Sequence, residues 1–263
     1  MSQKNTLAKE WIKKGESVCR TQNYQKAGKN WYRIYGEDLL QVVTFRGIPE
    51  RVDDVVYNRE PSVALIVFSL FESIPWVSVP IMGTKREIIP NILPSVLLSG
   101  QSPNRFLGTA FEAEQMVKLG LPFLDKIETH IHLAALLESY DRIGGAVQMN
   151  DPHKLIPYLL SGQIQKVYSV IDSIEKQNQQ AHQDNCRRMP GYDEEMMHLK
   201  MIQQLSPLLS IRENLQAANI HAIVAQLRDN YNRNIDFLYH MGLDCCKNQL
   251  TDDDLYERIK GHL

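Results

Sequence analysis

The N-terminal segment combines basic and aromatic side chains in the way that proteins binding single-stranded nucleic acid do. Residues 1–33 contain eight Lys and Arg residues against two glutamates, with four aromatic residues among them. Cations can follow a phosphate backbone while aromatic rings stack on bases. The residues predicted to make such contacts, or contacts to a protein partner, are Lys13, Lys14, Lys26, Lys29 and Arg33.

The charge balance argues against nucleic-acid binding by this segment. The net charge is −2; residues 1–108 carry +4 and residues 109–263 carry −6. Domains that track phosphates usually have a pI above about 9. We therefore favour the interpretation that the cations form a solvated face and the rings turn into the core. Nucleic-acid binding is kept as the alternative.

No motif for a known reaction is present. The chain lacks a phosphate-binding glycine loop, a Gly-x-Ser-x-Gly elbow and a zinc-protease His-Glu-x-x-His. His182 and Cys186 are spaced for one helical face, but no second ligand pair is evident from the sequence, and we predict no catalytic residue, metal ligand or cofactor. If the chain is an enzyme with a cleft between its modules, the first residues to mutate are Asp125, Glu128, His130 and His132.

The first third of the chain predicts one helix followed by strands. A helix is expected over 5–18, and two strands over 30–35 and 39–45 form a hairpin. Gly47-Ile48-Pro49 is expected to end the second strand. A polar connection then leads to the continuously apolar residues 62–72, which we predict to be a central buried strand, and residues 76–82 an edge strand or loop.

The rest of the chain predicts helices. Prolines and glycine over 88–105 indicate a connection between modules. The fold class is therefore α+β: an N-terminal helix plus an antiparallel β-meander in residues 1–90, followed by an irregular all-α module in residues 106–263. The expected helices cover residues 110–118, 123–140, 152–160, 164–182, 194–205, 208–219, 220–241 and 252–260.

A short motif in the first module resembles a known family. Residues 24–33 (YQKAGKNWYR), followed by Leu40-Gln41-Val42-Val43, resemble the opening of the bacterial domain-of-unknown-function family 4304. The resemblance covers roughly residues 5–75 and implies an α+β domain of one helix and an antiparallel meander. It implies no activity, substrate or catalytic residue. From the residues themselves, Trp31 is expected to fill the interface between sheet and helix, with Tyr32 and Arg33 alternating outward.

The compartment is predicted from the lack of a signal peptide or membrane span and from the low number of cysteines. Neither a signal peptide nor an apolar run long enough to cross a membrane is evident, and four cysteines are few for 263 residues. We expect a reduced, cytoplasmic bacterial protein without a membrane partner. The leading hypothesis is a non-catalytic protein of the immunity or accessory type that binds a protein partner, since its two differently charged modules suit electrostatic partner selection.

Overall fold

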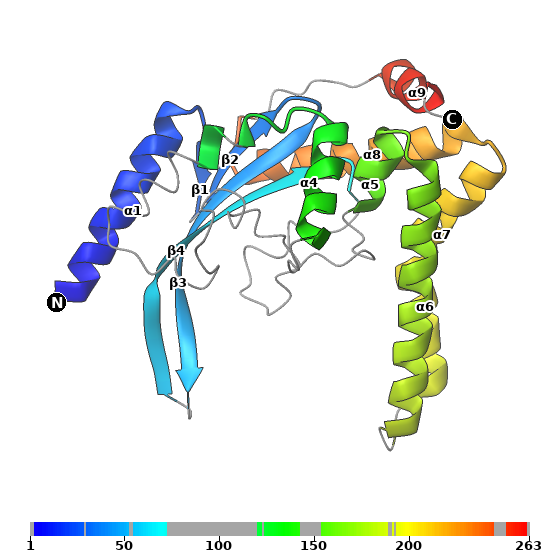
Figure 1. Ribbon diagram of the computed structural model, residues 1–263, viewed down its shortest axis with the longest axis horizontal. Coiled ribbons are helices and arrows are strands. Elements are labelled where there is room, and N and C mark those ends of the chain that lie inside the picture. Colours follow the sequence, from blue (N-terminus) through cyan, green and yellow to red (C-terminus); the bar gives the residue numbers. More distant parts are fainter. Residues whose placement is uncertain are drawn as a thin grey trace. The chain divides into compact units, whose positions relative to one another are not determined.

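The computed structural model confirms the α+β class (Figure 1). It describes residues 3–28, 30–52, 55–72, 120–122, 124–142, 154–188, 191, 193–244 and 251–261. The chain divides into two compact units. Unit 1 comprises Met1–Leu70, Trp76–His132 and Ile235–Cys246, and unit 2 comprises Phe71–Pro75, Leu133–Asn234 and Lys247–Leu263.

Unit 1 is built around an antiparallel sheet. Helix α1 (Gln3–Thr21) precedes four strands that pair in the order β1-β2-β3-β4. The predicted helix and the predicted hairpin are confirmed, and Gly36 turns the hairpin with a φ of +60°. The strands are β1 (Gln25–Ala27), β2 (Asn30–Tyr35), β3 (Leu39–Val52) and β4 (Val55–Ser69).

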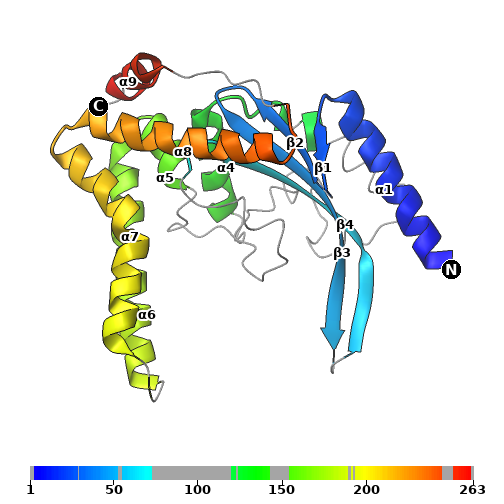
Figure 2. The ribbon, with the colours of Figure 1, turned by 180° about the vertical axis from the view of Figure 1, so that it is seen from behind.

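The prediction that residues 47–49 end the second strand is wrong. Strand β3 continues to Val52, and β4 begins at Val55 rather than at residue 62. A register shift between Gly47 and Pro49 absorbs the irregular residues. On β3, strand β2 pairs only with Leu39–Thr44, so the far part of β3 and β4 is a two-stranded ribbon (Figures 1 and 2). Proline is tolerated in this ribbon, because each strand has one edge whose amides need no hydrogen-bond partner from the sheet.

Strand β4 is an outer strand of the described sheet rather than the predicted central one. Its end is nevertheless fully packed, since residues 67–72 are all buried. The sheet buries side chains on both faces: Trp31 and Tyr32, neighbours on β2, are 2% and 3% exposed. Trp31 is buried, as expected, and the Arg20 guanidinium of α1 lies 5.8 Å from its ring centre, whereas Tyr32 does not face outward. Strand alternation places Arg33 on the same face as Trp31.

The described residues of unit 2 are mostly helical, as predicted. Helices α6 and α7 run side by side (Figures 1 and 2). The predicted break between residues 205 and 208 is wrong, because α7 continues through Pro207. The helices are α4 (His130–Arg142), α5 (Leu155–Leu160), α6 (Ile164–Arg188), α7 (Glu194–Gln216), α8 (Ile220–His240) and α9 (Asp252–Lys260); α4 begins, and α8 ends, with residues of unit 1.

Two helix starts in unit 2 are capped by side chains. Asp193 accepts a hydrogen bond from the Met196 amide at 2.9 Å, and Thr251 accepts one from the Asp254 amide at 3.2 Å. These caps explain why acidic residues gather there. The predicted connection at 88–105, the predicted strand at 76–82 and the predicted helix at 110–118 lie outside the described residues.

Candidate functional site

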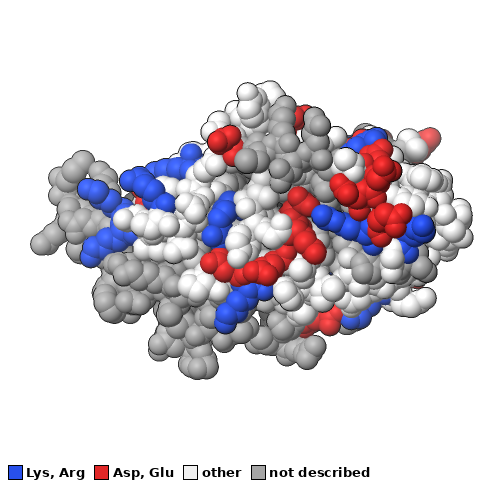
Figure 3. Space-filling view, turned by 90° about the horizontal axis from the view of Figure 1, so that it is seen from above, with Lys and Arg blue, Asp and Glu red and all other residues white. Residues whose placement is uncertain are grey.

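Two predicted contact residues are open to solvent. Lys13 and Lys14 are exposed on α1. Figure 3 shows mainly basic side chains, among the coloured ones, at the end of the view where α1 lies. Lys29 lies outside the described residues. A solvated basic face therefore exists on α1, as the charge argument expects.

Lys26 and the aromatic rings are tied into the unit. The Lys26 ammonium pairs with Glu16 of α1 and lies 5.7 Å from the centre of the Trp31 ring. Trp31, Tyr24 and Tyr32 are 2%, 4% and 3% exposed. Rings that are buried in the core cannot stack on bases. These three aromatic residues therefore belong to the fold rather than to a nucleic-acid surface.

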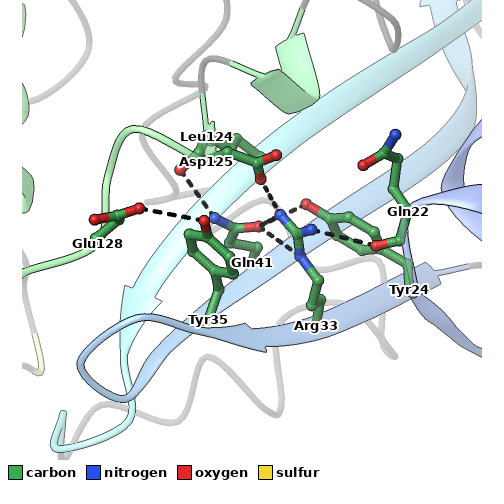
Figure 4. Close-up of polar contacts among 8 residues, drawn as sticks. All are labelled: Gln22, Tyr24, Arg33, Tyr35, Gln41, Leu124, Asp125 and Glu128. Carbon is green, nitrogen blue, oxygen red and sulfur yellow. Dashed lines mark hydrogen bonds and ion pairs between the residues drawn. The ribbon is translucent and has the colours of Figure 1, made fainter.

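Arg33 is the centre of a polar network on one face of the sheet (Figure 4). It pairs across β2 and β3 with Gln41. Its Nε and Nη2 atoms donate to Gln41 Oε1 at 3.1 and 2.6 Å, and Nη1 donates to the Gln22 carbonyl at 3.2 Å. Nη2 also forms an ion pair with Asp125. Arg33 is thus engaged inside unit 1 with 13% of its side chain exposed, and its contact with a partner or nucleic acid stays a prediction.

Gln41 joins this network to the rest of the unit. It has none of its surface exposed. Its Oε1 also accepts from the Tyr24 hydroxyl at 2.7 Å, and its Nε2 donates to the Leu124 carbonyl at 2.9 Å. Burial raises the pKa of Tyr24 above its ordinary value, against the lowering effect of Arg33, so this hydroxyl stays a donor. The Arg33 guanidinium lies between two rings, 4.5 Å from the centre of Tyr24 and 4.6 Å from that of Tyr35.

The segment around Glu128 is held against the hairpin turn. The Tyr35 hydroxyl donates to Glu128 Oε1 at 3.3 Å, and the Glu37 amide donates to the Glu128 carbonyl at 2.7 Å. A Cβ at Gly36 would lie 2.1 Å from that same carbonyl oxygen. Only glycine fits there, because the position combines a positive φ with a close backbone approach.

Next to this network, His130 contacts a serine through one ring nitrogen and a glutamate through the other. His130 Nε2 lies 2.9 Å from Ser69 Oγ, and His130 Nδ1 lies 3.7 Å from Glu37 Oε2. A nucleophile, its base and an orienting carboxylate have this order. However, Ser69 is 0% and His130 2% exposed, so neither side chain is open to solvent. The contact instead positions the start of α4 against the end of β4.

The four residues named for a possible enzyme do not converge on a cleft among the described residues. Asp125 binds Arg33, His130 binds Ser69, and Glu128 binds the hairpin. His132 Nδ1 accepts from the Glu128 amide at 3.4 Å. In the described part of the chain, no group of three or more His, Cys, Asp or Glu side chains could hold a metal ion.

Sequence reasoning missed Gln41 as an organising residue. A signal for it was present, because Gln41 is the one polar residue in the apolar run of residues 39–43. Such a run is expected to be buried on both faces, and a buried amide needs hydrogen-bond partners. Its partner Leu124 is 83 residues away in sequence, and nothing local to Gln41 predicts it.

Helix α7 carries apolar residues on two sides. Met197 and Met201 line a hollow next to α6, together with His182. On the outer side, Met196, Leu199 and Ile202 are spaced three apart and have exposed fractions of 45%, 61% and 46%. We call Met196, Leu199 and Ile202 the outer stripe. A helix that is apolar on both sides is expected to be covered on both sides.

Comparisons with known proteins give no relative. No protein-family model, curated protein or solved structure matches the chain. The resemblance to family 4304 therefore stays a prediction. Within the described ranges, no helix has both the length and the apolar character needed to cross a bilayer.

Proposed function

We propose that this protein acts by binding another protein through the outer stripe of α7. The observation that carries the proposal is the exposure of Met196, Leu199 and Ile202, each 45% or more. Since each side chain is about half exposed, covering it contributes about 1 kcal/mol. Three of them supply the apolar centre of an interface, although the costs of association reduce the net gain.

The spacing of the stripe indicates how a partner would bind. Side chains at i, i+3 and i+6 lie along one side of a helix, which is how helices dock into grooves. The start of α7 beside the stripe is acidic, with Glu194 and Glu195 exposed. The partner we propose is therefore a protein with an apolar groove whose rim is basic. This agrees with the charge of −6 over residues 109–263.

The contacts in unit 1 favour this proposal over nucleic-acid binding. Trp31, Tyr24 and Tyr32 are buried, and Arg33 is engaged with Gln41 and Asp125. Among the described residues, single-stranded nucleic acid would contact the exposed cations of α1, but no aromatic ring of the sheet would be available to stack on its bases. Such a surface provides salt-sensitive attraction but no stacking platform.

The proposal is tested by capture from the cells that produce the protein. The full chain carries a tag, and the matched variant carries Met196→Gln, Leu199→Gln and Ile202→Gln. We expect the wild type to retain a partner in a fixed ratio, with binding that weakens as salt rises, and the triple variant to lose it at least tenfold. Binding is then repeated with the purified partner to measure the affinity.

The control is Ile131→Gln, which removes an equally exposed apolar side chain, 56% exposed, from the start of α4. It should retain the partner. A wild type that captures nothing beyond the triple variant, or a triple variant that binds as tightly as the wild type, would show the proposal to be wrong. Concentration-dependent sedimentation of the wild type alone would mean that a second copy occupies the stripe, which also contradicts it.

A further inference from the structure

The hollow between α6 and α7 has the size of a site for one side chain. The two helices meet beside it, since the ring centres of His182 and His198 are 5.5 Å apart. Its volume is about 160 Å³. Pockets for whole small molecules usually have about 300–1,000 Å³, whereas a cavity of about 150 Å³ in another protein binds one benzene ring. Its lining includes Ala181, His182 and Asn185 of α6 and Met197, Lys200 and Met201 of α7.

The apolar part of the lining favours an aromatic ring. Met197 and Met201 are partly buried, and their thioethers make favourable contacts with the edges of aromatic rings. Methionine side chains are also flexible, so they can adjust to the ring that enters. On α6, Ala181 has a small side chain and is exposed, which leaves the hollow open to solvent.

The polar part of the lining favours a carboxylate next to that ring. Lys200 is exposed, and its ammonium forms no ion pair with any residue that the structure describes. The Asn185 amide, partly buried, likewise makes no hydrogen bond to a described residue. An ammonium and an amide N–H are both donors to a carboxylate. A ring with a carboxylate beside it would therefore match both parts of the hollow.

Lys200 connects the hollow with the outer stripe. It is four residues after Met196 of the stripe and three residues after Met197 of the hollow. Residues at these spacings are neighbours on a helix surface. A partner that covers the outer stripe therefore reaches the mouth of the hollow without leaving α7.

We propose that this hollow is a socket for one aromatic side chain of the partner, with a carboxylate of the partner bound by Lys200. The proposal rests on the proposed function, to which it adds the residues that determine specificity. Rings inserted into a pocket are frequent anchors of protein interfaces. The partner then has basic residues facing Glu194 and Glu195 and an acidic residue facing Lys200, a pattern that selects it by charge.

The probe for the socket is N-acetyl-phenylalanine, which has one aromatic ring and one carboxylate. It is titrated into the full chain, and NMR follows the isotope-labelled methyl groups of the methionines. We expect saturable shifts of the Met197 and Met201 signals, larger than the shift of Met196, with an affinity in the millimolar range for a ligand of this size. N-acetyl-phenylalaninamide, which has no carboxylate, should bind at least about threefold more weakly.

Two matched pairs of variants locate the bound probe. Ala181→Leu fills the hollow and should abolish the shifts, whereas Gln183→Leu adds the same side chain to an exposed position of α6 outside the lining and should not. Lys200→Gln should weaken binding about threefold or more, and Lys176→Gln, at an exposed lysine outside the lining, should leave it unchanged. All four positions are exposed, so the variants should fold, as checked by circular dichroism.

The same variants are then tested with the partner that the wild type captures. Ala181→Leu should lower its affinity at least tenfold, and Gln183→Leu should not. A partner that is lost by the stripe variant but bound normally by Ala181→Leu would overturn the socket and leave the proposed function standing. No saturable shift in the wild type, shifts that survive Ala181→Leu, or equal binding of the amide probe would also overturn the socket, whether or not a partner is captured.

Discussion

Two regions of this protein mix apolar and charged residues, and they fold in opposite ways. In the N-terminal segment three rings are inside: Tyr24, Trp31 and Tyr32 are at most 4% exposed, and Trp31 lies beneath the Lys26 ammonium. In α7 the apolar side chains are outside, and Leu199 is 61% exposed. The sequence pattern that first suggested a binding surface thus belongs to a core. The more promising surface lies on a helix whose pattern had suggested none.

The difference follows from how each region can cover its residues. A sheet has two broad faces, and in unit 1 Trp31 and Tyr32, on opposite faces of β2, are both enclosed. Two paired helices bury only the stripe that each turns toward the other. The end of α6 reflects this, because its described residues beyond Ile174 include none that is buried. Apolar residues on the outer side of α7 have no cover within such a pair.

The largest expected effect is in the hairpin turn of unit 1. Gly36→Ala places a Cβ against the Glu128 carbonyl in a backbone conformation that alanine disfavours, and we expect a loss of at least about 3 kcal/mol in the free energy of unfolding. Gly28→Ala is the control: it has the same φ of +60° but nothing within 4 Å, and should cost about 1 kcal/mol. Urea denaturation measures both. Equal losses would show that the Glu128 contact is not close.

The next effect compares a buried polar contact with an exposed one. Gln41→Leu leaves the donors of Arg33 and Tyr24 without their shared acceptor, and should cost about 2–3 kcal/mol. In the helical pair, Arg212 binds Asp172 and Glu175 at 3.1 and 2.9 Å near solvent. Arg212→Gln should therefore cost no more than about 1 kcal/mol. Urea denaturation measures both variants. A larger loss in the free energy of unfolding for Arg212→Gln than for Gln41→Leu would contradict this prediction.

A pH-dependent effect is expected from the core of unit 1. Burial, with a smaller effect of Glu16, raises the pKa of Cys19 from 9.0 to about 12. The unfolded chain therefore releases this proton first, and the stabilisation, complete below pH 9, is lost as the pH rises toward 12. The slope is at most about 1.4 kcal/mol per pH unit. Cys19→Ala should unfold with a shallower alkaline dependence than the wild type; identical slopes would mean that the thiol is solvated.

The smallest effect is expected where the apolar side chains are outside. Each of the substitutions Met196→Gln, Leu199→Gln and Ile202→Gln should change the free energy of unfolding by less than about 0.5 kcal/mol, because these side chains are already in water. Thermal melts of the single variants measure this. A loss of 2 kcal/mol or more, as expected for a core residue, would show that the stripe packs inside the chain.

Local patterns predicted the elements better than their ends. The alternation and apolar runs of β2 and the start of β3 were enough to predict the hairpin, and the helix predicted over 252–260 coincides with α9. Pro49 and Pro207 misled the prediction, because each was expected to end an element that pairing with a neighbour sustains. Proline weakens a strand or helix locally, but packing against residues distant in sequence can keep the strand or helix continuous.

The candidate sites depend on contacts that no local pattern contains. Arg33 meets Asp125 across 92 residues, and His130 meets Ser69 across 61. His182 and His198 are close in sequence, yet their contact requires α6 and α7 to lie antiparallel and in one register. The exposure of Leu199 is likewise a property of the packed helices and not of its sequence neighbours.

The central claim is that α7, rather than the basic N-terminal segment, is the contact surface. Photo-crosslinking in the producing cells tests it directly, with a photoreactive residue in place of Leu199 in one variant and of Lys14 in another. We predict a single crosslinked protein from position 199, lost when Met196→Gln and Ile202→Gln are added, and none from position 14. A specific crosslink from position 14 with none from position 199 would contradict the account.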